Sequence, residues 1–196
     1  MDLHPVDQEK VTVAGGARFN LRRIRADDKA KLYAGFQRLS LLSRYRRFFS
    51  SKAELSPEDL RFLTEFDAMN HLALGLFELD DHGVEGDTIG VGRYIRDPDD
   101  PAIAEFSLAV ADEYHSQGFG RLLLERLLST AADNGIKRLQ GYLLPDNTQV
   151  AKLIKKVRHA ALMYREDGLT KACVPTLDIP ETVIEQWPSQ RLGEMH

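Results

Sequence analysis

The sequence of 196 residues contains one cysteine, Cys173, and no group of histidines and cysteines with the spacing of a zinc site. A single thiol cannot form an internal disulfide, so we expect neither a secreted disulfide scaffold nor a metal site. Long apolar runs are also missing, because nowhere do about 18 apolar residues follow one another. The N-terminus, residues 1–5, lacks a basic segment followed by an apolar one. We therefore predict a cytoplasmic protein without a membrane span.

The sequence also lacks a strong excess of either charge. Its 26 lysines and arginines and 30 aspartates and glutamates give a net charge of −4, so the whole molecule is not an electrostatic binder of nucleic acid. Apolar residues make up 43% and charged residues 29%, as in an ordinary globular domain. No repeat or long linker divides the chain. We predict an N-terminal leader over 1–17, one domain over 18–178 and an acidic tail over 179–196.

Hydrophobic periodicity indicates which segments form strands and which form helices. The order is strand, helices, two or three antiparallel strands, helix, strand, helix and a strand pair, which indicates one α+β domain. Ser56, followed by proline and two acids, is typical of a helix start. The predicted strands are 18–24, 71–79, 88–96, 102–110, 138–144, 161–165 and 169–176, and the predicted helices are 26–39, 41–48, 56–66, 117–134 and 145–157.

The segment 110–122 runs from a predicted strand through a turn with Gly118 and Gly120 into a long predicted helix. The first N–H groups of a helix lack backbone partners and lie at the positive end of its dipole, so this turn can hold phosphate groups. Glycines would let a diphosphate approach these N–H groups closely. The alternative interpretation is a tight turn without a ligand. The sequence has neither a Walker-type loop nor an early dinucleotide-binding loop.

The motif His115-Ser116-Gln117-Gly118-Phe119-Gly120 resembles the Q/R-x-x-G-x-G/A loop of the GNAT superfamily of acyl-CoA-dependent N-acetyltransferases. The order of elements over 18–177 is similar to that fold. The resemblance implies a mixed, mostly antiparallel sheet of six to seven strands flanked by helices, and acetyl-CoA as cosubstrate. It also implies a strand along the pantetheine arm, with an N–H group near Val110 facing the thioester oxygen, and a turn around the diphosphate. The residues so implied are Leu108, Ala109, Val110, Gln117, Gly118, Phe119, Gly120, Arg121 and Leu122.

A second segment, 147–159, stands where the family has N-x-x-A-x-x-L-Y-x-K-x-G-F, and its asparagine, leucine and second lysine match. Asn147 is thereby implied as a cofactor ligand, with a helix cap as the alternative. The chain departs from the family pattern at several positions, and Arg158-His159 stands in place of Gly-Phe. His115 replaces glutamine or arginine, and Ile154 replaces the tyrosine that in many relatives protonates the departing CoA thiolate. Tyr142 is a candidate to replace that phenol.

Four segments, 39–49, 55–60, 92–98 and 104–106, are similar to bacterial protein lysine acetyltransferases that modify enzymes such as acyl-CoA synthetases. This resemblance implies a protein lysine as the acceptor. Two alternatives stay open. One is acetylation of a small amine such as a polyamine, an amino acid or an aminoglycoside, and the other is a module that binds acyl-CoA without transferring the acyl group. Association of two copies is open as well.

Acetylation of lysine needs a base, because a free lysine has a pKa of about 10.4 and is protonated at neutral pH. Glu105 is our candidate, directly or through a water, because it is an acid in an apolar strand where burial would make it more basic. The resembling lysine acetyltransferases place a glutamate at this position. In the alternative interpretation Glu105 faces solvent or pairs with Arg93 or Arg96. Tyr114 and His115 border the site, as proton carriers or as structural residues.

The predicted helix 41–48 carries Arg44, Arg46 and Arg47 beside aromatic residues. These arginines either steer an acidic protein surface towards the acceptor cleft or only solvate a helix whose aromatic residues enter the core. Nucleic-acid binding here is not favoured, because no other basic stripe accompanies the patch.

Overall fold

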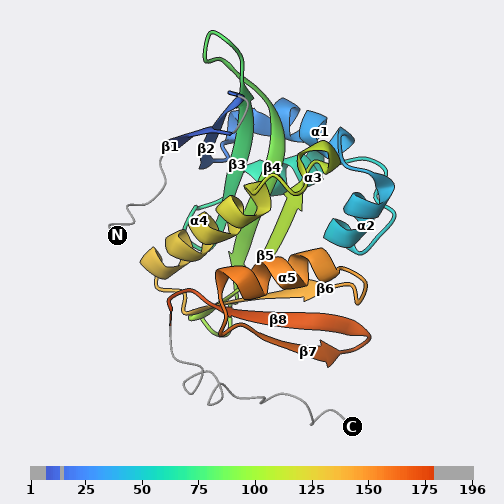
Figure 1. The fold of residues 1–196 in the computed structure, drawn as a ribbon, viewed down its shortest axis with the longest axis vertical. Coiled ribbons are helices and arrows are strands. Elements are labelled where there is room, and N and C mark those ends of the chain that lie inside the picture. Colours follow the sequence, from blue (N-terminus) through green and yellow to red (C-terminus); the bar gives the residue numbers. More distant parts are fainter. Residues whose placement is uncertain (1–7, 14–15, 179–196) are drawn as a thin grey trace.

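A computed structural model of the chain describes residues 8–13 and 16–178 (Figure 1). The described residues form one sheet of eight strands in the order β1-β2-β3-β4-β5-β6-β8-β7. Neighbouring strands are antiparallel, except that β5 and β6 are parallel. The strands are β1 (Gln8–Thr12), β2 (Arg18–Arg23), β3 (His71–Leu79), β4 (Glu85–Arg96), β5 (Ile103–Val110), β6 (Arg138–Leu143), β7 (Leu162–Glu166) and β8 (Leu169–Pro175). The helices are α1 (Lys29–Gln37), α2 (Leu41–Phe48), α3 (Pro57–Thr64), α4 (Phe119–Asp133) and α5 (Thr148–Val157), with 3-10 turns η1 (Ala26–Asp28) and η2 (Asp112–Tyr114).

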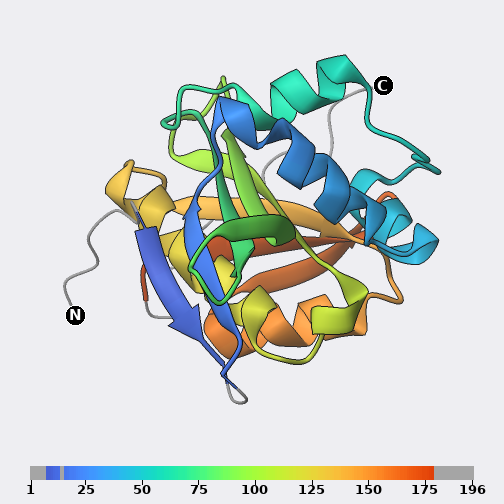
Figure 2. The same ribbon diagram turned by 90° about the horizontal axis from the view of Figure 1, so that it is seen from above.

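The sheet lies between two layers of helices (Figure 2). Helices α1 and α3 pack together on one face, where α1 contacts β4, and α4 crosses the other face beside α5. Helix α2 contacts β5 from the side of α1 and α3. This arrangement is the α+β architecture that the order of elements predicts.

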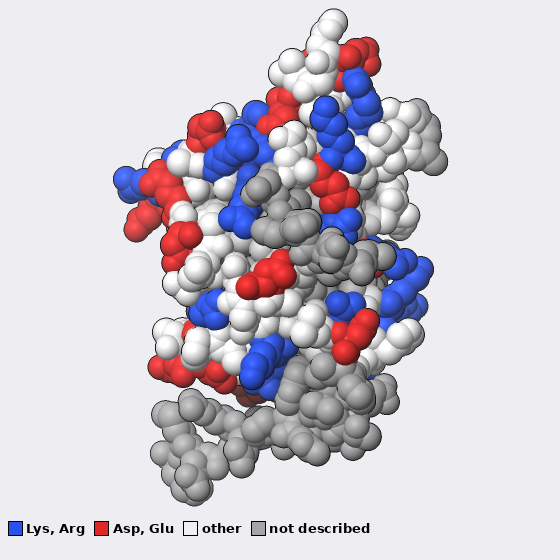
Figure 3. Space-filling model, turned by 90° about the vertical axis from the view of Figure 1, so that its left-hand side faces the viewer, with Lys and Arg blue, Asp and Glu red and all other residues white. Residues whose placement is uncertain are grey.

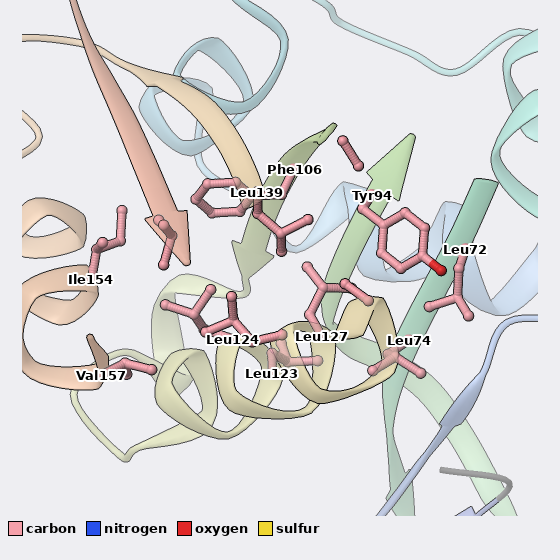
Figure 4. Close-up of a cluster of buried hydrophobic side chains, with 14 of the residues drawn as sticks. Leu72, Leu74, Tyr94, Phe106, Leu123, Leu124, Leu127, Leu139, Ile154 and Val157 are labelled. Carbon is pink, nitrogen blue, oxygen red and sulfur yellow. The ribbon is translucent and has the colours of Figure 1, made fainter. Parts of the chain in front are cut away.

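The main core lies between the sheet and α4 (Figure 4). Leu123, Leu124 and Leu127 of α4 are fully buried and belong to the same cluster as Tyr94 and Leu139 of the sheet. Their spacing of three and four residues puts them on one helix face. Each such leucine contributes about 1.5–3 kcal/mol relative to an exposed one. Burial of this face therefore fixes the direction of α4 across the sheet.

Several local predictions are confirmed. Ser56 caps α3, since its hydroxyl accepts from the Asp59 N–H at 3.1 Å and the Asp59 carboxylate accepts from the Ser56 N–H at 2.8 Å. Helix α4 ends before Gly135, whose φ of +78° is in the left-handed region that glycine tolerates. The turn between β7 and β8 falls at Asp167 and Gly168, both with positive φ.

The predicted strand count was too low. Strand β1 lies within 1–17, which we expected to be a leader, and it pairs antiparallel with β2. Its residues are too polar to signal a strand, but Val11 packs against the core and Glu9 pairs with Arg126 of α4 at 2.7 Å. A short polar edge strand is stabilised mainly by its partner, which the local pattern does not reveal. The predicted tail over 179–196 lies outside the described residues.

One buried arginine, Arg22, is partnered by two carboxylates. Arg22 of β2 is almost fully buried and pairs with Asp28 at 2.7 Å, while its Nε donates to Glu85 at 2.8 Å. The guanidinium also stacks on Phe77, 4.0 Å from the ring centroid. The hydrogen bond with Arg22 lowers the pKa of Glu85 to about 2. The pair thus meets the requirement that a buried charge be compensated.

The described surface is mixed in charge. On the face shown in Figure 3, lysines and arginines alternate with aspartates and glutamates. In the part of the chain that the structure covers, none of the helices has the length and apolar character needed to cross a membrane.

Candidate active site

Strands β5 and β6 pair over three residues and then separate. Residues 103–105 pair with 138–140, whereas β5 continues along β4 until Val110 lies opposite Gly90. From Phe106 onwards, the β6-facing edge of β5 pairs with no strand among those described. A cleft of about 690 Å³ opens at this edge, lined by residues of α2, β5, α4, β6 and α5.

The main chain of β5 points polar groups into this cleft that no described strand pairs with. The Ala111 N–H donates to the Ile89 carbonyl of β4 at 2.8 Å. Since bonding alternates along an antiparallel pair, Leu108 and Val110 point their N–H and C=O groups to the opposite side. The Val110 carbonyl there accepts from His115 Nε2 at 2.9 Å. The strand therefore offers an edge that an extended ligand can pair with.

The start of α4 reaches the same cleft. Gly118 is the cap residue with a φ of +92°, and the first helical bond runs from the Leu122 N–H to the Gly118 carbonyl at 3.0 Å. The N–H groups without a helical acceptor are thus those of Gly118, Phe119, Gly120 and Arg121, and we call these four donors the anion cradle. Leu122 was expected to donate to the diphosphate, and this expectation is wrong because its N–H is used within the helix.

Most of the predicted site residues meet at the cleft. Its lining includes Glu105, Leu108, Ala109, Val110, Gly118, Gly120, Arg121 and Asn147, but not Gln117, Phe119 or Leu122. The Phe119 ring is buried 4.7 Å from the ring of Phe19, so only its main chain remains at the surface of the cradle. The Gln117 side chain instead donates to the Glu113 carbonyl at 2.9 Å. Packing against α5 is a second reason for a glycine at position 120, because a Cβ there would lie 3.3 Å from Leu153 Cδ2.

Helix α5 adds positive charge to the cleft. Lys152 and Lys156 line it, together with Arg121 of α4. Asn147 stands at the cap position of α5, but its side chain makes no capping hydrogen bond. The helix-cap alternative for this side chain is therefore not realised, and the side chain faces the cleft instead.

Glu105 lies at the last paired position before β5 and β6 separate. It is opposite Ile95 in the register, on the same face as Ser107 and Ala109. Glu105 is exposed to the cleft, so the expected burial of this carboxylate is wrong. The pairing of β5 with β6 ends here, and the side chain lies beside the open cleft. Arg47 of α2 lines the same cleft, and the Glu105 carboxylate favours its charged form although no ion pair joins the two.

The tyrosines near the cleft have hydroxyls engaged with carboxylates. Tyr114 donates to Glu78, and Tyr142 donates to Glu166 at 2.8 Å. Burial, with the neighbouring carboxylate, raises the pKa of each phenol. Ile154 is fully buried in the core beside Val157 (Figure 4). Neither tyrosine is therefore directed at the cleft as a free proton donor.

One cleft contact was not foreseen. Arg46 of α2 donates to Asp146, just before α5, at 2.9 Å. This ion pair joins the two sides of the cleft. No spacing in the sequence signals it, because the partners are a hundred residues apart.

Comparisons with known proteins agree with this geometry. The sequence pattern of the Acetyltransferase (GNAT) family matches residues 38–159. "Acetyltransferase Pat" of Mycolicibacterium smegmatis is 29% identical over 171 residues, covering 86% of this chain and 49% of that protein. The crystal structure of the GNAT domain of S. lividans PAT has a TM-score of 0.75 and 25% identity, covering 88% of this chain and 99% of that one.

A structure of a cAMP-binding acyltransferase from Mycobacterium smegmatis aligns with a TM-score of 0.57 and 26% identity, over 91% of this chain and 52% of that one. The chain thus spans about half the length of the M. smegmatis proteins that it matches. The family match covers more than half of the chain and includes every residue that lines the cleft. The chain therefore belongs to the GNAT family of acetyltransferases.

Proposed function

We propose that the protein transfers an acetyl group from acetyl-CoA to the ε-amine of a protein lysine. One observation carries the proposal: a carboxylate, Glu105, stands where β5 and β6 separate, in the cleft that the start of α4 also enters. A base, an unpaired strand edge and an anion cradle therefore share one cavity. These are the parts that acyl transfer from a thioester to an amine requires.

The residues of the cleft fit acetyl-CoA. The free N–H groups of Gly118, Gly120 and Arg121 suit the diphosphate. Lys152 and Lys156 supply positive charge for the remaining phosphate. The edge of β5 suits the amides of the pantetheine arm. Asn147, with no capping bond of its own, is free to donate to the same arm.

Acetyl-CoA supplies an acyl thioester, and the chain supplies a proton acceptor and hydrogen-bond donors. Glu105 takes a proton from the lysine ammonium, directly or through a water, and leaves the nitrogen lone pair free. The N–H groups of Leu108 and Val110 stabilise negative charge on the thioester oxygen. As the N–C bond forms, the C–S bond breaks and CoA leaves as a thiolate. The nitrogen loses its second proton as the amide forms, and we infer that water in the cleft carries this proton to the thiolate, because Ile154 is buried and both nearby phenols donate to carboxylates.

Two observations support lysine in a protein as the acceptor. The segments 39–49, 55–60, 92–98 and 104–106 are similar to bacterial protein lysine acetyltransferases. In the structure, all four segments contribute residues to the cleft or to the cavity beside it, around Glu105 and α2. The acceptor side of the cleft is thus built from the same segments that carry the resemblance.

The test is release of CoA thiol on addition of acetyl-CoA and one acceptor at a time. Lysine peptides, polyamines, free amino acids and aminoglycosides form the acceptor panel, and mass spectrometry locates the added 42 Da. We expect thiol release and acetylation with lysine peptides. Acetylation confined to small amines would overturn the choice of acceptor, and acetyl-CoA binding without thiol release above background hydrolysis would overturn the transferase activity.

A further inference from the structure

Two arginines, one in the acceptor end of the cleft and one in the cavity beside it, lack the carboxylate partners that Arg22 and Arg38 have. Arg22 is paired with Asp28 at 2.7 Å, and Arg38 with Glu78 at 2.9 Å. Arg47 and Arg93 form no ion pair with any residue that the structure describes. Burying a charge without a counter-charge is costly, so a persistent unpaired arginine needs an explanation.

Arg47 projects from α2 into the cleft. It lines both the main cleft and an adjoining cavity of about 60 Å³ on the side of α1 and α3. Its guanidinium stacks on Phe48, 4.8 Å from the ring centroid, and donates no hydrogen bond to the residues described. Burial lowers the pKa of Arg47 to about 10, an effect that the charge of Glu105 opposes. All the N–H donors of this guanidinium are therefore left for a ligand.

Arg93 stands behind Arg47 and adds a second positive charge. It is 2% exposed, and its Nη2 donates to the Leu63 carbonyl at 2.6 Å. Its Nη1 donates to His71 Nε2, which accepts because burial lowers the pKa of His71 to about 4 and keeps the imidazole neutral. Its Nε, like the hydroxyl of Thr88 in the same cavity, is buried without a partner. Every partner of Arg93 is thus uncharged.

We propose that Arg47, supported by Arg93, forms a carboxylate-binding subsite at the acceptor end of the cleft. This inference rests on the proposed function. A carboxylate matches the planar fork of an arginine and would supply the ion pair that Arg47 and Arg93 do not form with any described residue. Two reactants can bring it: an acceptor with an acidic side chain beside its lysine, or an acyl thioester whose acyl chain ends in a second carboxylate.

The first experiment measures binding without turnover. Glutarate is titrated into the protein by calorimetry, with neutral glutaramide as the control ligand. We expect glutarate to bind and Arg47→Gln to weaken it at least tenfold. Arg47→Lys, which keeps the charge but loses the fork, should lie between. Arg61→Gln, on the exposed side of α3, is the matched control and should bind as the wild type does.

The second experiment identifies which reactant carries the carboxylate. In the acceptor arm, two peptides that differ only by glutamate or glutamine beside the lysine are compared with acetyl-CoA. In the donor arm, succinyl-CoA and acetyl-CoA are compared with the glutamine peptide. We expect a preference of at least tenfold in kcat/KM for the carboxylate in one arm, reduced to less than twofold by Arg47→Gln and unchanged by Arg61→Gln.

The outcomes separate the two proposals. Equal rates in both arms of an active enzyme, or a preference that persists in Arg47→Gln, would overturn the subsite. If no peptide is acetylated, the proposed function fails, and the glutarate titration then tests the subsite alone. Glutarate binding that is lost in Arg47→Gln would support the subsite. Absence of glutarate binding in an inactive protein would overturn both.

Discussion

The anion cradle can be tested by comparing two glycines at opposite ends of α4. Gly118 begins the helix with a φ of +92°, and Gly135 follows its end with a φ of +78°. A Cβ added at either position meets no atom within 4 Å, so the cost of alanine is limited to the backbone. For a residue with a side chain, this left-handed conformation costs about 1–2 kcal/mol.

Both alanine variants should therefore lose similar stability. A loss of 1 kcal/mol lowers the melting temperature of a domain of this size by about 2–4 °C, so we expect a decrease of about 2–8 °C in each. Gly118→Ala should also weaken CoA binding, because a backbone that rotates to relieve the strain redirects its N–H groups. One lost hydrogen bond to a phosphate corresponds to about 1.5–3 kcal/mol, or about 10–150-fold in Kd.

Calorimetric titration with CoA and thermal denaturation measure the two effects separately. Gly135→Ala should retain the wild-type Kd despite its lower melting temperature. The reasoning would be refuted by an unchanged Kd in Gly118→Ala, or by an equal loss of affinity in both variants.

Three further predictions concern the base, a buried ion pair and a close contact. Glu105→Gln should lower kcat about 100- to 10,000-fold at neutral pH and leave the Kd for CoA unchanged. The deficit in the rate of thiol release should shrink as the pH approaches the lysine pKa of about 10.4, where the amine loses its proton without a base. A deficit that stays constant with pH would contradict the assignment of Glu105 as the base. Because the pKa of Glu85 is lowered to about 2, its contribution to the free energy of unfolding is complete above about pH 5 and lost as the pH falls towards 2. Urea denaturation at pH 5 and pH 3 should show this loss in the wild type and a smaller one in Arg22→Met, whereas equal losses would exclude the pair as the cause. Gly35→Ala should lower the free energy of unfolding by about 1–3 kcal/mol or more, because the alanine Cβ would lie 2.1 Å from the Thr88 carbonyl oxygen. An unchanged midpoint of urea denaturation would show instead that α1 can move away from β4 at no cost.

Much of the architecture follows from local patterns. The apolar stripe of α4, the cap at Ser56 and the turn before Gly168 each depend on residues a few positions apart, and the structure has all three. The glycine loop at the start of α4 belongs to the same class, because its chemistry depends on one turn of helix. Strand β1 could not be predicted in this way, since its pairing depends on β2 and on Arg126 of α4.

The site required more than the sequence. Which N–H groups are free at the start of α4 depends on where its first hydrogen bond forms, and that bond removes Leu122 from the cradle. The exposure of Glu105 follows from the place where β5 and β6 separate, which alternation along one strand does not show.

By itself the sequence determined most of the secondary structure, the family resemblance and the candidate base, because these depend on residue types at short spacing. Only the tertiary structure decided that β5 has a free edge and that Arg47 and Arg93 line the same small cavity beside the cleft without an ion pair to any described residue. The physical reason is that a charge is compensated or left unpaired by residues far apart in the chain, and folding alone brings them together or keeps them apart.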